Sequence, residues 1–261
     1  MAIKDKDAIR RAIVTPDKHF PLHDKKAISI VCQAIEIVKP DIYIDLGDTG
    51  EWEYFSTHYW KGRNKKPMED LIPLLNKDVK AVNKGMDIID KSLDKVGCKE
   101  RHFCQGNHEV WLDNFVIRYP YLDKYKTENA LRIEERGYKY HPYNRKKKLK
   151  IGKINFTHGH KTGMHHAKAH LSCYKQSVMY GHTHDLQRYT DTGLGGTMSA
   201  WSLGCLKDID KDEDWLRGNI TNWNHAFAII DFYKNGNYKV EIVEIIKGVT
   251  SLWGQLLKGN K

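Results

Sequence analysis

The ten residues RHFCQGNHEV, at positions 101–110, join a short apolar run to a polar loop. The first four predict a strand, and Gly106 can adopt a backbone angle that is costly for other residues. Asn107, His108 and Glu109 then stand at the start of a helix. α/β proteins keep their chemistry at such strand exits, because the strand fixes loop residues that still reach the substrate. Asn and His are both ligands of divalent metal ions, although GNHE alone also fits an ordinary turn.

Four further strand-like runs end in the same manner, each followed by a carboxylate or a histidine. The side chains concerned are Asp17, His19, Asp48, His158, His160, His182 and His184. Each has an ordinary explanation when taken singly, because a lone histidine is usually a core or surface residue. The motifs DKH, GD, GNHE, HGH and GHTH nevertheless occur in order, each after a strand-like run, and together they indicate one site.

The segments between these motifs predict alternating strands and helices. Residues 11–15 and 42–46 read as strands joined by an amphipathic helix that Asp24 caps and Pro40 stops, which gives a β-α-β unit. A long helical pattern covers 68–96, with a break near Pro73 left open. Further helices are expected over 111–125, 127–137 and 167–176. The runs at 197–205, 225–233 and 238–246 predict a second, largely antiparallel sheet.

Composition bounds the class of protein. The chain has 261 residues and 40% hydrophobic content, enough for the core of one domain. It opens with charged residues and has no run near the ~20 apolar residues of a membrane helix, so we expect a soluble, cytoplasmic protein with no membrane partner. Five scattered cysteines without a CxxC pair predict reduced, mostly buried thiols, and neither a disulfide framework nor a thiolate zinc site.

The net charge of +10 is unevenly distributed. Residues 136–184 contain eleven Lys or Arg, no Asp or Glu, and eight of the fourteen histidines. A basic, histidine-rich region suits a polyanionic partner such as nucleic acid or a phosphate ester. A solvated basic hairpin explains the same composition equally well.

The five motifs together resemble those of the calcineurin-like metallophosphoesterases, a superfamily that includes double-strand-break repair nucleases, phosphoprotein phosphatases and purple acid phosphatases. The resemblance covers about residues 10 to 190. It implies an α/β fold, a four-layer αββα sandwich of two mixed β-sheets flanked by helices. We expect a single domain over residues 1–261, with a helical insertion at about 56–98 and 109–136.

The resemblance also implies a centre with two divalent metal ions. One ion would be bound by Asp17, His19 and His184, the other by Asn107, His158 and His182, with Asp48 bridging both. Two such ions lower the pKa of a shared water, so that a bridging hydroxide can attack phosphorus. The nitrogen-rich donor set favours manganese, with iron, zinc, nickel or cobalt as alternatives. His108 would donate a proton to the leaving oxygen or stabilise its charge, and we count it with Asp48 as catalytic.

Four further residues are candidates for substrate contact: Glu51, Arg145, His160 and Lys161. The sequence also departs from common patterns of the family. Glu51 in GDTGE stands where many members have Asp. The GDxVDRG continuation of phosphoprotein phosphatases is absent, which argues against that branch.

The first expectation for function is hydrolysis of phosphodiester bonds in DNA or RNA, since residues 136–184 could neutralise a phosphate backbone. Tyr138, Tyr140, Tyr143 and the aromatic residues near Trp52 could stack on bases. The alternatives are a phosphomonoesterase or small-nucleotide phosphodiesterase, and a binding module that keeps the fold without catalysis. A structural zinc site is a further alternative, using His165, His166 and His170. The sequence leaves the oligomeric state open.

Overall fold

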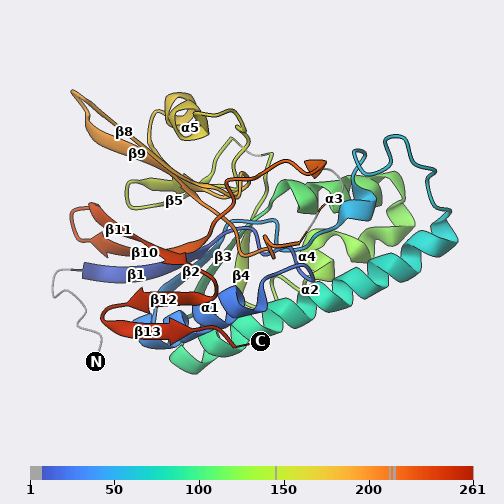
Figure 1. The fold of residues 1–261 in the computed structure, drawn as a ribbon, viewed down its shortest axis with the longest axis horizontal. Coiled ribbons are helices and arrows are strands. Elements are labelled where there is room, and N and C mark those ends of the chain that lie inside the picture. The colour runs from blue at the N-terminus through green and yellow to red at the C-terminus, as the bar shows by residue number, and fades with distance from the viewer. Residues whose placement is uncertain (1–7, 145, 212, 214–215, 261) are drawn as a thin grey trace.

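The computed structural model describes residues 8–144, 146–211, 213 and 216–260, which form two large mixed sheets, a small hairpin and several helices (Figure 1). The first sheet has the strand order β11-β10-β1-β2-β3-β4. Its strands are β1 (Ala8–Thr15), β2 (Ile42–Asp45), β3 (Glu100–Cys104), β4 (Tyr138–His141), β10 (His225–Tyr233) and β11 (Tyr238–Ile245). Strands β1 to β4 run parallel, whereas β10 and β11 are antiparallel additions beside β1.

The second sheet has the order β5-β6-β7-β9-β8. Its strands are β5 (Leu149–Ile151), β6 (Ile154–Phe156), β7 (Ser177–Tyr180), β8 (Leu186–Gly193) and β9 (Gly196–Leu203). Strands β6, β7 and β9 are parallel. The expectation that residues 197–246 form one antiparallel sheet is therefore wrong, because β9 joins β7 while β10 and β11 complete the first sheet. Alternation of apolar residues marks a strand but does not select its partner.

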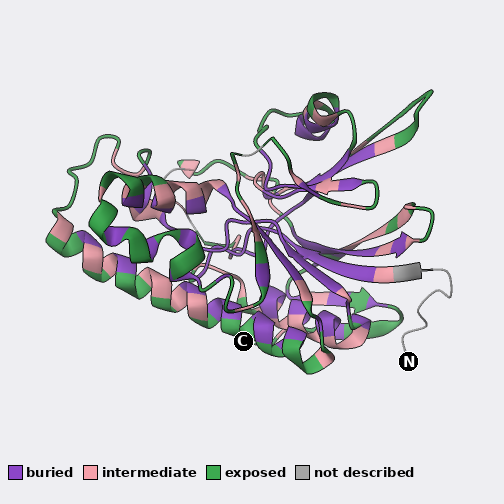
Figure 2. Cartoon of the chain, turned by 180° about the vertical axis from the view of Figure 1, so that it is seen from behind, coloured by how far each residue is buried: buried purple, intermediate pink, exposed green. Residues whose placement is uncertain are grey.

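Helices cover the outer faces of both sheets and give the four layers that the sequence predicts. On the first sheet lie α1 (Lys25–Val38), α2 (Met68–Val96), α3 (Asn107–Arg118), α4 (Thr127–Ala130) and the 3-10 helices η1 (Glu53–Phe55) and η2 (Pro120–Tyr125). Helix α5 (His166–Tyr174) packs on the second sheet through Ala167 and Leu171. Between the sheets, Val14 and Ile44 meet Phe156 and Met179. Figure 2 shows that the strands are largely buried, whereas the outer side of α2 is exposed.

Local signals account for most helix boundaries. The Asp24 carboxylate accepts from the backbone N–H of Ala27 at 2.6 Å, and α1 ends at Lys39 in the left-handed conformation. Helix α2 continues through Pro73, its sixth residue, without the break considered above; the missing N–H forfeits one hydrogen bond within the helix. The helix expected over 127–137 is wrong beyond Ala130. Arg132 has a φ of 54° there, because Leu131 and Ile133 both turn into the core.

The remaining features concern the C-terminus, the cysteines and the membrane. Strands β12 (Val249–Leu252) and β13 (Gln255–Lys258) form a separate hairpin beside α1. All five cysteines are free thiols, as expected. Cys98, Cys104 and Cys205 are buried, whereas Cys32 is partly buried and Cys173 is exposed. Over the described residues, no helix combines the length and the apolar character needed to cross a bilayer.

Candidate metal centre

All seven expected metal ligands lie at the exits of parallel strands. The loops after β1, β2 and β3 come from the first sheet, and the loops after β6 and β7 come from the second. They carry, in that order, Asp17 and His19; Asp48; Asn107; His158; His182 and His184. The two sheets meet there, since Nδ1 of His158 lies 3.0 Å from the Leu46 carbonyl oxygen, and the Asp17 carboxylate accepts from the backbone N–H of His182 at 2.9 Å. The centre therefore belongs to the edge shared by both sheets.

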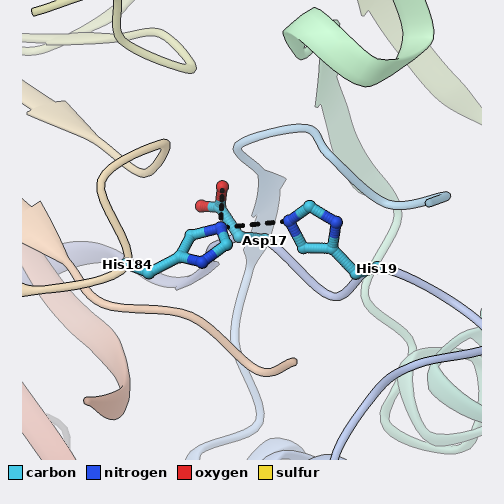
Figure 3. A group of neighbouring side chains, drawn as sticks. All are labelled: Asp17, His19 and His184. Atoms are coloured by element: carbon cyan, nitrogen blue, oxygen red, sulfur yellow. Dashed lines mark hydrogen bonds and ion pairs between the residues drawn. The ribbon is translucent and has the colours of Figure 1, made fainter. Parts of the chain in front are cut away.

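Asp17, His19 and His184 form the first group of converging side chains (Figure 3). Nε2 of His184 lies 3.1 Å from Nε2 of His19 and 3.4 Å from Oδ1 of Asp17. All three residues are buried. Ligand atoms that share one divalent ion at ~2.1 Å stand ~3.0–3.4 Å apart in octahedral or tetrahedral geometry, so the spacing of this group fits an ion.

Asn107, Asp48, His158 and His182 form the second group. Nε2 of His158 lies 2.9 Å from Oδ1 of Asn107, 3.2 Å from Nδ1 of His182 and 3.2 Å from Oδ2 of Asp48. The other ring nitrogen of His158 faces the Leu46 carbonyl and must donate to it, which leaves Nε2 with a lone pair in the neutral ring. The second group therefore presents nitrogen and oxygen donors suited to a divalent ion.

Asp48 joins the two groups through a single oxygen atom. Its Oδ2 lies 3.2 Å from Nε2 of His158, 3.9 Å from Nε2 of His19 and 3.8 Å from Nε2 of His108. Its other oxygen, Oδ1, accepts from the backbone N–H of His108 at 2.9 Å. An oxygen that faces donors of both groups has the position expected of a shared carboxylate.

The backbone of these loops is held in an unusual conformation. Five of the seven expected ligands have positive φ, a region that residues other than glycine rarely adopt: Asp17 (20°), His19 (51°), Asp48 (47°), His182 (74°) and His184 (62°). Strain of this kind clusters at functional sites. Glycine is also required beside two carboxylates, since a Cβ on Gly181 would stand 1.8 Å from Asp17 Oδ2 and one on Gly106 would stand 2.1 Å from Asp48 Oδ1.

The acid-base properties of the centre reflect two buried carboxylates. Burial alone would raise the pKa of Asp48, but His158 and His108 outweigh it and hold that pKa well below its usual value. Asp17 is shifted down in the same way, by His158 and His184. Burial works against a charge on His158, yet Asp48 and Asp17 raise its pKa to about 9. Burial lowers the pKa of His19 and of His182 to about 4, so both rings are neutral at pH 7 and able to bind metal.

Two buried lysines neutralise the carboxylates that lie behind the centre. Nζ of Lys18, on the loop between Asp17 and His19, lies 2.7 Å from Oδ1 of Asp45, and both side chains are buried. Nζ of Lys207 lies 3.0 Å from Oε2 of Glu51, whose same oxygen accepts from Nδ1 of His19 at 2.9 Å. Within the described residues, Asp17 and Asp48 form ion pairs with histidines alone. No lysine or arginine of the described residues therefore competes with a metal ion for these two carboxylates.

The role of Glu109, the fourth residue of GNHE, was not predicted from the sequence. Its buried carboxylate accepts four backbone N–H groups at 2.9–3.1 Å, from Asp48, Thr49, Gly50 and Gly106. The side chain thus ties the loop after β2 to the start of α3. A glutamate at the third position of a helix is a known capping signal and could have indicated this role. Lys207 was missed as well, and no local pattern marks it.

The residues expected at the substrate are dispersed. Glu51 is bonded to His19 and Lys207, which is the arrangement of a residue that orients a ligand. His160 and Lys161 are exposed, and their backbone N–H groups both face Nε2 of His170, at 3.1 and 3.4 Å. Arg145 lies outside the described residues.

The alternative of a structural zinc site is not supported. Nδ1 of His166 faces the Tyr180 hydroxyl at 2.6 Å and its Nε2 faces Asp185 at 3.0 Å. Both ring nitrogens of His170 are taken by backbone groups. In the part of the chain that the structure describes, the groups able to hold a metal do not include His165, His166 or His170.

Sequence comparison finds two phage proteins of similar length. The chain is 26% identical over 270 residues to the Gene 54 protein of Mycobacterium phage D29, covering 95% of this chain and 98% of that protein. It is 25% identical over 265 residues to the Gene 54 protein of Mycobacterium phage L5, with the same coverage. Neither name states an activity, and no family model matches the chain.

Structure comparison gives distant likenesses at 12% identity or less. A single mutant of Vps29 from Entamoeba histolytica has a TM-score of 0.48 over 96% of this chain and 99% of that one. A dimetal phosphatase from Danio rerio has 0.45 over 97% and 100%, and Vps29 from Chaetomium thermophilum has 0.40 over 97% and 98%. Likenesses at this level assign no activity. The two mixed sheets flanked by helices are the architecture that the resemblance to the calcineurin-like metallophosphoesterases implies, and the seven expected metal ligands meet at one edge of the fold.

Proposed function

We propose that the chain is a metal-dependent phosphoesterase that hydrolyses phosphodiester bonds, with nucleic acid as the first candidate substrate. The position of Asp48 Oδ2, within 4 Å of His19, His108 and His158, carries this proposal. A carboxylate oxygen between two donor groups suits a pair of ions that activate water and stabilise the leaving oxygen, which is the chemistry of a dinuclear hydrolase.

In this proposal, Asp17, His19 and His184 hold one divalent ion, Asn107, His158 and His182 hold the other, and Asp48 contacts both. Two ions held there would polarise the phosphoryl group and lower the pKa of a water molecule. The nitrogen-rich donors favour manganese, with iron, zinc, nickel and cobalt as alternatives. Because its pKa is well below the usual range, Asp48 stays ionised and serves as a ligand, with no part in proton transfer.

His108 is the candidate for contact with the leaving group. Its Nδ1 donates to the Glu51 carbonyl oxygen, so Nε2 points toward Asp48 and the centre. Its ring is fixed between His19, at 4.6 Å between centroids, and Trp111, at 3.9 Å. The ligand atoms of His108, His19 and Asp48 also lie close enough together to share a metal ion. In this proposal the other residues supply the ligands, and the fixed imidazole of His108 would hydrogen-bond the departing oxygen or give it a proton.

Positive charge beside His158 favours a polyanionic substrate such as nucleic acid. Lys147 and Lys148 line a small hollow together with Tyr143 and His158. The basic stretch contributes less than its composition suggested, because Arg136 pairs with Asp87 and Asp90. Tyr138 and Trp52 are buried as well and cannot stack on bases. A phosphomonoesterase or a small-nucleotide phosphodiesterase could use the same centre, and activity must separate them.

The test is a comparison of three substrates with protein loaded with Mn, Ni, Co or Zn. We expect hydrolysis of bis-p-nitrophenyl phosphate and of labelled DNA or RNA, and slower hydrolysis of p-nitrophenyl phosphate. Asp48→Asn should abolish all activity, and His108→Ala should reduce it by about 10²–10⁴ with bound metal retained. Preference for the monoester would favour a phosphomonoesterase. Bound metal without turnover of any substrate would favour the binding module.

A further inference from the structure

The metal centre adjoins two segments that are basic and free of acidic residues. One is the stretch 136–184, which supplies Tyr143, Lys147 and Lys148. The other is the segment 54–68, which follows the Asp48 loop and has four Lys or Arg, four aromatic residues and no Asp or Glu. Its lysines and arginine are exposed. Positive charge is thus carried by two separate parts of the chain, one lining the hollow beside His158 and the other following the Asp48 loop in sequence.

A line of contacts runs from Tyr143, in the first of these segments, through the centre to Trp111 on α3. The ring of Tyr143 lies 6.0 Å from that of His158, whose Nε2 is 3.2 Å from Asp48. Asp48 is 3.8 Å from His108, and the His108 ring stacks on Trp111 at 3.9 Å. An aromatic residue therefore stands at each end of the line, and the carboxylate stands between them.

From Trp111 the aromatic surface continues along α3. Trp111, Phe115 and Tyr119 recur at helical spacing; each packs against the core on one side and is partly exposed. The rings of Phe115 and Tyr119 are 5.1 Å apart, and Tyr121 extends the row at 6.1 Å from Tyr119. From His108 to Tyr119 the helix rises ~16 Å, the length of about five stacked nucleotides at ~3.4 Å each.

The second basic segment is attached beside this row. The ring of Phe55 packs against Phe115 at 4.8 Å, which fixes the start of the segment on α3. Farther along, the Arg63 guanidinium lies over the Tyr59 ring at 4.5 Å, and Tyr59 contacts Tyr54 at 5.0 Å. Exposed charge and half-exposed rings are therefore interleaved on one surface.

We propose that this surface binds single-stranded nucleic acid. The strand would cross the metal centre, with phosphates against Lys147 and Lys148 on one side and the basic residues of 54–68 on the other, and with bases stacked on the α3 row. Aromatic faces stack only on bases that are not paired, and such stacking tolerates any sequence. The inference rests on the proposed function, since it names the substrate of the same centre.

The test compares two triple variants that remove the same charge. Lys61→Ala/Lys65→Ala/Lys66→Ala alters the proposed surface. Lys150→Ala/Lys153→Ala/Lys175→Ala alters exposed lysines at the starts of β6 and β7 and on β5, away from the strand exits. Binding of a labelled 12-nucleotide oligothymidylate is measured by fluorescence anisotropy in EDTA, so that cleavage cannot occur. Hydrolysis of bis-p-nitrophenyl phosphate with Mn is measured in parallel.

We expect the first triple variant to bind the oligothymidylate more weakly, with a slope of log affinity against log salt that is smaller by about 2, at about 0.7 per lost phosphate contact. The second triple variant should bind like wild type. Tyr59→Ala should weaken binding of the oligothymidylate at least about fivefold, and binding of a duplex of equal length hardly at all. All of these variants should hydrolyse the small diester at the wild-type rate.

An equal loss of oligothymidylate binding in both triple variants, or no loss in either, would overturn the proposed binding surface. Duplex binding as tight as that of the oligothymidylate would overturn its preference for single strands. If the small diester is cleaved but the first triple variant binds normally, only this inference fails. If oligonucleotide binding behaves as expected but no metal supports hydrolysis, the proposed function fails and the binding surface stands.

Discussion

Replacing Lys18 tests how much its buried ion pair with Asp45 contributes to the stability of the fold around the strand exits. Its ammonium lies 2.7 Å from Oδ1 of Asp45, with side-chain exposures of 1% and 2%. Lys18→Met would leave the Asp45 charge buried without its partner, which costs about 3–5 kcal/mol in comparable pairs. Asp45 keeps hydrogen bonds from the Gly47 N–H and the Thr49 hydroxyl, so we expect the lower end, about 3 kcal/mol.

A double variant separates the charge from the packing. Lys18→Met/Asp45→Asn removes both charges, while the amide oxygen can still accept from Gly47 and Thr49. We expect its free energy of unfolding to lie within about 1 kcal/mol of the wild-type value, since replacing both partners of a buried pair is often neutral. Urea unfolding of metal-free protein at pH 7 gives the free energies of unfolding of wild type, the single variant and the double variant. The exposed pair of Lys95 and Glu36 supplies the control, where Lys95→Met should cost less than about 1 kcal/mol.

Two results would refute this reasoning. The first is a Lys18→Met variant as stable as the Lys95→Met control. The second is a double variant that loses the full cost of Lys18→Met, because the penalty would then come from packing and not from an unpaired charge.

Three other variants test the groups that support the centre. Glu109→Ala leaves four loop N–H groups without their acceptor and should cost about 4 kcal/mol in urea unfolding at ~1 kcal/mol each, whereas the exposed Glu135→Ala should cost almost nothing. Glu51→Gln should weaken Mn binding about 10- to 100-fold by calorimetry, since it loosens His19, and unchanged affinity would contradict that role. Burial lowers the pKa of His170 to about 3 against ~6.5 when unfolded, so acidification from pH 8 to pH 5 should favour unfolding by about 2 kcal/mol through this group. The His170→Asn variant lacks this group, so its free energy of unfolding should fall by about 2 kcal/mol less than that of wild type between pH 8 and pH 5. If the stability of the variant changes with pH as that of wild type does, the assignment is refuted.

The sequence predicted the parts of the fold that depend on local signals. The β-α-β unit from β1 to β2 follows from the Asp24 cap, an amphipathic helix and Pro40, all within a few turns of chain. The five strand exits were recognisable because each motif directly follows its strand. The antiparallel pairing of β10 with β11 was predicted as well, since the two strands are consecutive. The pairing of β10 with β1 was not, because it joins residues more than 200 positions apart.

The same division applies to the candidate site. Asp17, Asp48 and His158 could be singled out because each stands in a short motif. The roles of Glu51 and Lys207 depend on a contact between the β2 exit and a residue beyond the segment that carries the family resemblance. Buried ion pairs of this kind leave no periodic pattern in the sequence, so only the tertiary structure identifies them.

Anomalous scattering from crystals soaked in Mn²⁺ tests the dinuclear centre most directly. The account predicts two peaks ~3.5–4 Å apart on either side of Asp48 Oδ2, one beside His19 and His184 and the other beside His158 and His182. A single peak remote from Asp48, or full Mn²⁺ loading in an Asp48→Asn variant, would contradict it.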